Sequence, residues 1–149
     1  MVAPPPVLFA AAFLTAFGLD HLVPLPRPPA DVAENLRVAG WIVFALGHVV
    51  MFAGIGRFAR ARTTIVPHGH ASSLVTSGVY ALTRNPMYVG LTIAYVGLTA
   101  QQRLLWALPF LALPLTALAR VVVPFEEARL RRLFGDAYTT YCARVRRWI

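Results

Sequence analysis

The residues best suited to chemistry lie at the junction of a polar segment and an apolar run, at Arg84, Asn85 and Pro86. Asn is a favoured helix N-cap and Pro fits the first helical turn, so this pair predicts a helix start. The free N–H groups of a helix start attract anions, and an adjacent arginine can bind a carboxylate through two hydrogen bonds. The junction therefore predicts a site for an anionic group.

Two acidic residues in the C-terminal segment, Glu126 and Glu127, could form the other half of such a site. A carboxylate can accept hydrogen bonds from an ammonium group or from hydroxyl groups. The competing interpretation is structural, because Glu127 can pair with Arg131 one helical turn away, for a few tenths of a kcal/mol. Charge so close to a membrane face favours a functional role for at least one of the two.

Three tyrosines, Tyr88, Tyr138 and Tyr141, accompany these groups. Their rings could face a cationic ligand group, an interaction worth about 0.5–2 kcal/mol. They could equally form the aromatic belt that membrane proteins place at the bilayer surface. The sequence leaves both interpretations open.

The composition is typical of a membrane protein. Hydrophobic residues make up 58% of the chain and charged residues 13%, with a mean hydropathy of +0.62, whereas soluble proteins carry about 25% charged residues. All 14 basic residues are arginines, and they flank the apolar runs, which favours anionic lipid headgroups over nucleic acid as their partners. Cys142 is the sole cysteine, so an intrachain disulfide is excluded and a cysteine-ligated metal site is not expected.

Four apolar runs predict an all-α polytopic membrane helix bundle in a single domain. The expected spans cover about residues 7–25, 38–56, 87–100 and 104–123. The third would extend only about 20 Å, less than a hydrocarbon core of roughly 30 Å, and it would form a tight hairpin with the fourth. Pro109 and Pro114 are expected to kink the fourth.

Small residues recur on two of these helices and predict close packing. Gly40, Gly47 and Gly54 repeat every seven residues, which places them on one helix face. Gly90 and Gly97 lie on a second such face in the third span.

A few polar residues interrupt or adjoin the apolar runs. Asp20, followed by His21, is expected at the membrane interface, and His48 is expected as a hydrogen-bonded interior histidine. His68 and His70 have the spacing of a ligand pair, but no third ligand is evident, so no metal site is predicted.

The polar segment 57–86 and the tail 124–149 hold ten of the fourteen arginines. With four crossings they lie on the same side, and the arginine bias predicts that this side is cytoplasmic, together with the N-terminus, in the cell (inner) membrane. The tail is expected to be an amphipathic helical segment, in which Gly135 ends one helix and Asp136 begins the next.

Two segments carry a resemblance to a known family. The sequence RNPMYVG at 84–90, followed by PFEEARLRRLFGDAYTTYCARVRRWI from Pro124, resembles the integral-membrane isoprenylcysteine carboxyl methyltransferases and phospholipid methyltransferases, as a prokaryotic member. The likeness covers about residues 63–149. Asn85 stands where eukaryotic members have histidine, Val79 stands where many relatives have proline, and Arg120 is offset from the arginine that precedes the family's acidic pair.

The resemblance implies S-adenosyl-L-methionine as methyl donor, bound on the cytoplasmic side, and a lipophilic acceptor that enters from the bilayer. In-line methyl transfer depends mainly on proximity and alignment, and only an amine acceptor would require a base, for which Glu127 is the candidate. By position, the resemblance assigns Glu127 and Arg120 to catalysis. It assigns to the cofactor site Val75, Gly78, Tyr80, Arg84, Asn85, Pro86, Tyr88, Gly90, Glu126, Glu127, Tyr138 and Tyr141.

Two other functions stay open. The chain could be a small proton-coupled exporter that uses Asp20 and works as a dimer, although the long polar segment and tail argue against this. It could also be a nicotinamide-dependent membrane reductase. Neither nucleic acid nor a protein partner is indicated by the sequence.

Overall fold

The structure, a computed structural model, describes residues 4–61 and 73–149. Within these two ranges the chain forms helices and loops without a strand, which confirms the all-α prediction. The predicted histidine pair at 68 and 70 lies outside the described residues. The elements in chain order are α1 (Pro5–Leu22), α2 (Ala30–Arg60), the 3₁₀ turn η1 (Gly78–Ala81), α3 (Pro86–Gln102), α4 (Ala107–Phe110), α5 (Ala112–Ala117), the π turn η2 (Leu118–Val122) and α6 (Val123–Arg144).

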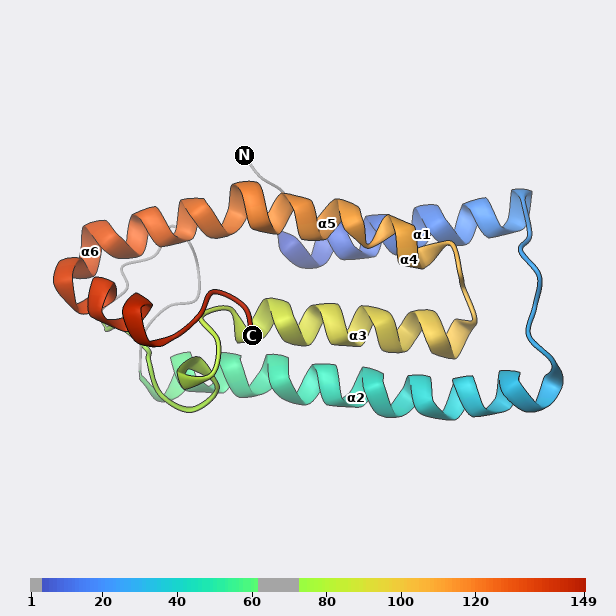
Figure 1. The fold of residues 1–149 in the computed structure, drawn as a ribbon, viewed down its shortest axis with the longest axis horizontal. Helices are drawn as coiled ribbons and strands as arrows, with labels where there is room; N and C mark the ends of the chain where they lie inside the picture. Colours follow the sequence, from blue (N-terminus) through green and yellow to red (C-terminus); the bar gives the residue numbers. More distant parts are fainter. Residues whose placement is uncertain (1–3, 62–72) are drawn as a thin grey trace.

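The helices form an elongated bundle in which α2 and α3 run side by side and α1 lies along α4 and α5 (Figure 1). Among the described residues, three helical stretches are long and apolar enough to cross a membrane: Pro5–Leu22, Ala30–Arg60 and Ala107–Arg144. Large apolar side chains such as Leu14, Trp41 and Phe52 are exposed on the outside of these stretches, as expected for surfaces that face lipid. The chain is therefore a multi-pass membrane helix bundle.

The remaining apolar helix, α3, is the short third span of the sequence analysis. It has 17 residues and extends about 26 Å, somewhat more than predicted. It ends at Arg103, whose left-handed conformation (φ 56°) turns the chain back toward α4 in a tight hairpin.

The fourth span and the tail form one almost continuous helical stretch. Pro124 does not break this helical stretch, because it lies in the first turn of α6, where proline is tolerated, directly after the π turn η2. The helix instead changes direction at Gly135 (φ 49°, ψ −122°), where a helix end was predicted. The tail after Gly135 thereby folds back toward the start of α3 (Figure 1).

Glycines bring the backbones of α2 and α3 into contact, as the seven-residue repeat predicted. A Cβ atom on Gly90 would lie 2.6 Å from the carbonyl oxygen of Gly47, and one on Gly47 would overlap the backbone of Ala94. Gly97 meets the backbone at Phe44 in the same way. Such close approach maximises dispersion contacts between helices where lipid removes the hydrophobic driving force.

An ion pair between Asp20 and Arg27 lies at the end of the bundle where α1 connects to α2. Asp20 is 8% exposed and pairs with Arg27, which also donates to the carbonyl oxygen of Arg103 at 3.2 Å. The indole N–H of Trp106 donates to the carbonyl oxygen of Val23 at 2.9 Å. These bonds fasten the α1–α2 connection to the α3–α4 turn, so the carboxylate of Asp20 serves as a structural anchor near the end of its helix.

His48 is half-buried, and its Nδ1 lies 2.9 Å from the carbonyl oxygen of Phe44, one helical turn earlier. This is the hydrogen-bonded interior histidine that the sequence predicted.

We expect Asp20→Asn to lower the free energy of unfolding by about 1 kcal/mol without preventing the protein from folding. The loss is modest because Arg27 is half exposed. Thermal unfolding followed by circular dichroism measures the change. Asp31→Asn, which removes an exposed carboxylate at the start of α2, is the matched control. An Asp20→Asn variant as stable as the wild type would contradict the anchoring role of the Asp20–Arg27 pair.

Candidate active site

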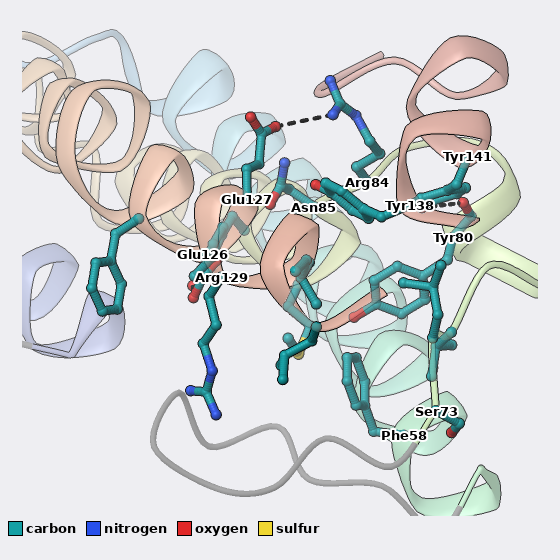
Figure 2. Close-up of a pocket in the computed structure, with 17 residues that line it drawn as sticks. Phe58, Ser73, Tyr80, Arg84, Asn85, Glu126, Glu127, Arg129, Tyr138 and Tyr141 are labelled. Carbon is teal, nitrogen blue, oxygen red and sulfur yellow. Dashed lines mark hydrogen bonds and ion pairs between the residues drawn. The ribbon is translucent and has the colours of Figure 1, made fainter. Parts of the chain in front are cut away.

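A pocket lies at the other end of the bundle, where the start of α3 meets α6 (Figure 2). The end of α2 and the segment before η1 complete its wall, so segments far apart in the sequence line one cavity. The described residues of the polar segment therefore lie at the same end of the bundle as the tail, as expected from four crossings. The sequence-predicted residues that line the pocket are Val75, Tyr80, Arg84, Asn85, Tyr88, Glu126, Glu127, Tyr138 and Tyr141.

Four other predicted residues do not line this pocket. Gly78 adopts a positive φ (65°), and a Cβ there would overlap the Arg57 side chain. Pro86 is buried in the first turn of α3, and Gly90 packs against the backbone of α2. Arg120 lies on η2 with an exposed side chain, away from the pocket lining.

Glu127 is the most strongly paired carboxylate of the site. It is 5% exposed and accepts two hydrogen bonds from Arg147, Nε to Oε1 at 2.9 Å and Nη2 to Oε2 at 2.7 Å. Arg84 approaches the same Oε1 through Nη1 at 3.1 Å. In the described part of the chain, Glu127 thus pairs across the fold with two arginines, and the predicted partner Arg131 is exposed instead. The hydrogen bonds to Glu127 raise the pKa of the Arg147 guanidinium.

Arg84 is held between α6 and the C-terminal segment. Its Nη1 donates to the sulfur of Cys142 at 2.7 Å, and its backbone N–H donates to the carbonyl oxygen of Arg146 at 3.0 Å. The buried Nε has no hydrogen-bond partner among the described residues. An arginine N–H in that state is an available donor for an anionic ligand group.

Asn85 occupies the N-cap position of α3, but its side chain does not cap the helix. The side-chain amide donates to the carbonyl oxygen of Arg147 at 2.8 Å instead, which corrects the predicted capping role. The helix start itself is as predicted, with Pro86 in the first turn. As a result α3 begins beside Arg84 without a side-chain cap.

The tyrosines contribute both rings and hydroxyl groups to the pocket. The Tyr88 hydroxyl donates to Oε1 of Glu126 at 2.6 Å, and the Tyr141 hydroxyl donates to the carbonyl oxygen of Tyr80 at 2.7 Å. Tyr138 is almost fully buried, with its ring 6.1 Å from that of Tyr141. Burial raises the pKa of Tyr80 well above its usual range, because a phenolate would lose its hydration there. These four rings give the pocket an aromatic wall.

Comparison with known proteins identifies the family. The family model described as phospholipid methyltransferase matches residues 36–137. The chain belongs to the phospholipid methyltransferase family. It is 30% identical over 117 residues to protein-S-isoprenylcysteine O-methyltransferase B of Arabidopsis thaliana and 31% identical to protein-S-isoprenylcysteine O-methyltransferase A of the same plant. Each match covers 71% of this chain and 55% of the relative, so the chain spans about half the length of the curated relatives it matches. No solved structure matches the chain.

The family match contains the start of α3 and the Glu126–Glu127 pair, but it ends before the C-terminal residues that complete the pocket. Arg147 and Cys142 were not predicted as site residues. Nothing in the local sequence distinguishes Arg147, since it lies in a run with Arg144 and Arg146. Only the close pairing of residue 147 with Glu127 in space singles it out.

Charge is distributed unevenly along this phospholipid methyltransferase family member. At the end closed by the ion pair, three arginines are balanced by three acidic residues: Arg27, Arg37, Arg103, Asp20, Asp31 and Glu34. The formal net charge of +8 therefore resides in the rest of the sequence, where ten arginines fall within residues 57–86 and 124–149, the two segments that contribute most of the pocket residues.

Proposed function

We propose that this protein is an integral-membrane methyltransferase that takes its methyl group from S-adenosylmethionine and delivers it to a lipophilic acceptor. The observation that carries the proposal is the convergence of Arg84, the uncapped start of α3 and the Glu126 carboxylate in one aromatic-walled pocket. This pocket lies at one end of an apolar bundle that belongs to a methyltransferase family.

The groups that line the pocket fit the functional groups of the donor. The Nε of Arg84 and the start of α3 suit its carboxylate, because both offer N–H groups to an anion. The rings of Tyr80, Tyr138 and Tyr141 suit a sulfonium or an adenine ring. When bound, the donor supplies an activated methyl group on a positively charged sulfur.

The two glutamates suit different tasks. Glu127 already accepts two hydrogen bonds from Arg147 and forms an ion pair with Arg84, so both of its oxygens are engaged within the fold. Among the described residues, Glu126 accepts a hydrogen bond from the Tyr88 hydroxyl, and it lines the pocket. We therefore assign to Glu126 the contact with the donor's ammonium or ribose hydroxyls. For an amine acceptor, Glu126 is also better placed than Glu127 to take the proton that the nitrogen releases.

An apolar crevice beside the pocket suits the hydrophobic part of an acceptor. It lies between α1, α2 and α3 and is lined by Phe9, Phe13 and Leu14 of α1 together with residues of the other two helices. Along α3, Tyr88 lines the pocket, and Leu91 and Tyr95 line the crevice at successive turns of the same face. A lipid chain in the crevice would place its polar head near Tyr88.

Both carboxylate and amine acceptors are compatible with this layout. The two plant relatives are named as isoprenylcysteine O-methyltransferases, whereas the family is described by phospholipid methylation. We propose the cell membrane as the location, with the pocket and both termini on the cytoplasmic side, because arginine-rich segments remain there.

Calorimetric titration of detergent-purified protein with S-adenosylhomocysteine tests the proposal. We expect saturable binding at one site per chain, and no heat of binding with NADPH, the cofactor of the reductase alternative. Well-folded protein that binds NADPH but not S-adenosylhomocysteine would refute the methyltransferase assignment.

A further inference from the structure

The segment that follows α6 runs along the start of α3. Helix α6 ends at Arg144, and Val145 is extended (φ −122°, ψ 129°). We call residues 145–148 the C-terminal strap. Its carbonyl groups accept from the turn before α3: Arg146 from the backbone N–H of Arg84 at 3.0 Å, and Arg147 from the side chains of Thr83 at 3.2 Å and Asn85 at 2.8 Å.

Both ends of the strap are fixed. On one side, the Tyr141 ring in the last turns of α6 is 4% exposed, and its hydroxyl donates to the carbonyl oxygen of Tyr80. On the other side, Trp148 packs against the apolar core formed by α1, α3 and the fourth helical stretch. The strap therefore presents Arg147 to the site in a defined position.

Arg147 is the residue that joins the two halves of the pocket. Its carbonyl oxygen accepts a hydrogen bond from the Asn85 side-chain amide at the start of α3, and its guanidinium donates to both oxygens of Glu127 on α6. Because Arg147 already donates a hydrogen bond to each oxygen of Glu127, Arg84 contributes only its Nη1 to the carboxylate. The Nε of Arg84 stays without a hydrogen-bond partner among the described residues.

We propose that Arg147 is a positioning residue for the donor's amino-acid moiety. By hydrogen-bonding both oxygens of Glu127, it prevents Arg84 from forming a bidentate pair with the same carboxylate. The inference rests on the proposed use of S-adenosylmethionine. Without the Arg147 side chain, both N–H groups at one edge of the Arg84 guanidinium would bind Glu127 in a bidentate pair, since an isolated buried carboxylate favours that geometry. Arg84 would then be withdrawn from the carboxylate of the ligand.

Two ligands separate positioning from general support. S-Adenosylhomocysteine carries the amino-acid moiety, whereas 5′-methylthioadenosine keeps the nucleoside and thioether but lacks it. For Arg147→Gln we expect the Kd for S-adenosylhomocysteine to rise on the order of tenfold, while the Kd for methylthioadenosine changes less than about twofold. Arg147→Lys keeps the charge without the fork and should fall between wild type and Arg147→Gln.

Arg146→Gln is the matched control, because it removes the same charge from the exposed neighbouring side chain. It should bind both ligands like the wild type. If Arg147→Gln binds S-adenosylhomocysteine like the wild type, or loses both ligands equally, the positioning role is refuted. If Arg147→Gln does not fold, Arg147→Lys is judged by the same two ligands. Failure of the wild type to bind S-adenosylhomocysteine would instead refute the proposed function itself.

Discussion

Replacement of Arg84 by alanine is expected to raise the Kd for S-adenosylhomocysteine by at least about 100-fold. The substitution removes the N–H groups that we assign to the ligand carboxylate, and it leaves the buried Glu127 with Arg147 alone. Truncating one partner of a buried, hydrogen-bonded charge pair across a binding interface costs about 2–5 kcal/mol of affinity, and the proposed contact between Arg84 and the ligand carboxylate is such a pair. The lost contact with Glu127 lowers the stability of the protein instead. Calorimetric titration measures the affinity, and circular dichroism checks that the helices remain.

Arg84→Lys and Arg120→Ala are the informative controls for this experiment. Lysine keeps the charge but cannot reproduce the planar fork, so Arg84→Lys should recover only part of the affinity. Arg120 was predicted as a catalytic residue, yet its side chain is exposed and outside the pocket lining. Arg120→Ala should therefore bind S-adenosylhomocysteine like the wild type. Equal losses in Arg84→Ala and Arg120→Ala would mean that net charge, and not the position of Arg84, governs binding.

Gly47→Val is expected to have the largest effect on stability, at least about 3 kcal/mol, and to prevent recovery of monodisperse protein. The first added carbon would overlap the backbone of Ala94 and lie 2.6 Å from the carbonyl oxygen of Gly90. Neither neighbour is a flexible side chain, so the two helices must separate along their length. Size-exclusion chromatography in detergent and thermal unfolding measure the outcome.

Gly56→Val in the same helix is the matched control. A Cβ on Gly56 meets nothing within 4 Å, whereas the backbone and helix-propensity changes are the same as at Gly47. We expect Gly56→Val to be recovered like the wild type. Similar losses for both variants would attribute the effect to the intrinsic properties of valine in a helix, and the backbone contact between α2 and α3 would then not be decisive.

The features that repeat or cluster in the sequence could be predicted from it. The seven-residue spacing of glycines identified the packed face of α2, because a helical period places such residues on one line. The Asn85–Pro86 pair identified the start of α3. The arginine clusters, together with four crossings, indicated that the polar segment and the tail share one end of the bundle.

The parts that depend on a single contact in space could not be predicted. Three arginines follow Cys142 within five residues, and only the path of the strap determines that Arg147 is the one that reaches Glu127. Helical spacing offered Arg131 as the partner of Glu127, but a buried carboxylate gains more from two convergent arginines across the fold than from one exposed neighbour. The Asn85 side chain similarly prefers the strap carbonyl to the helix start.

The position of the strap along the chain has a consequence for biosynthesis. Ribosomes make proteins from the N-terminus, so the glycine-packed pair α2 and α3 can enter the bilayer and associate while α6 is still being made. The strap follows α1, α2, α3 and α6 in the order of synthesis, and Arg147 is among its residues. A nascent chain therefore acquires the apolar bundle before it acquires a complete pocket, and ligand binding can stabilise only molecules whose C-terminal segment has already folded back.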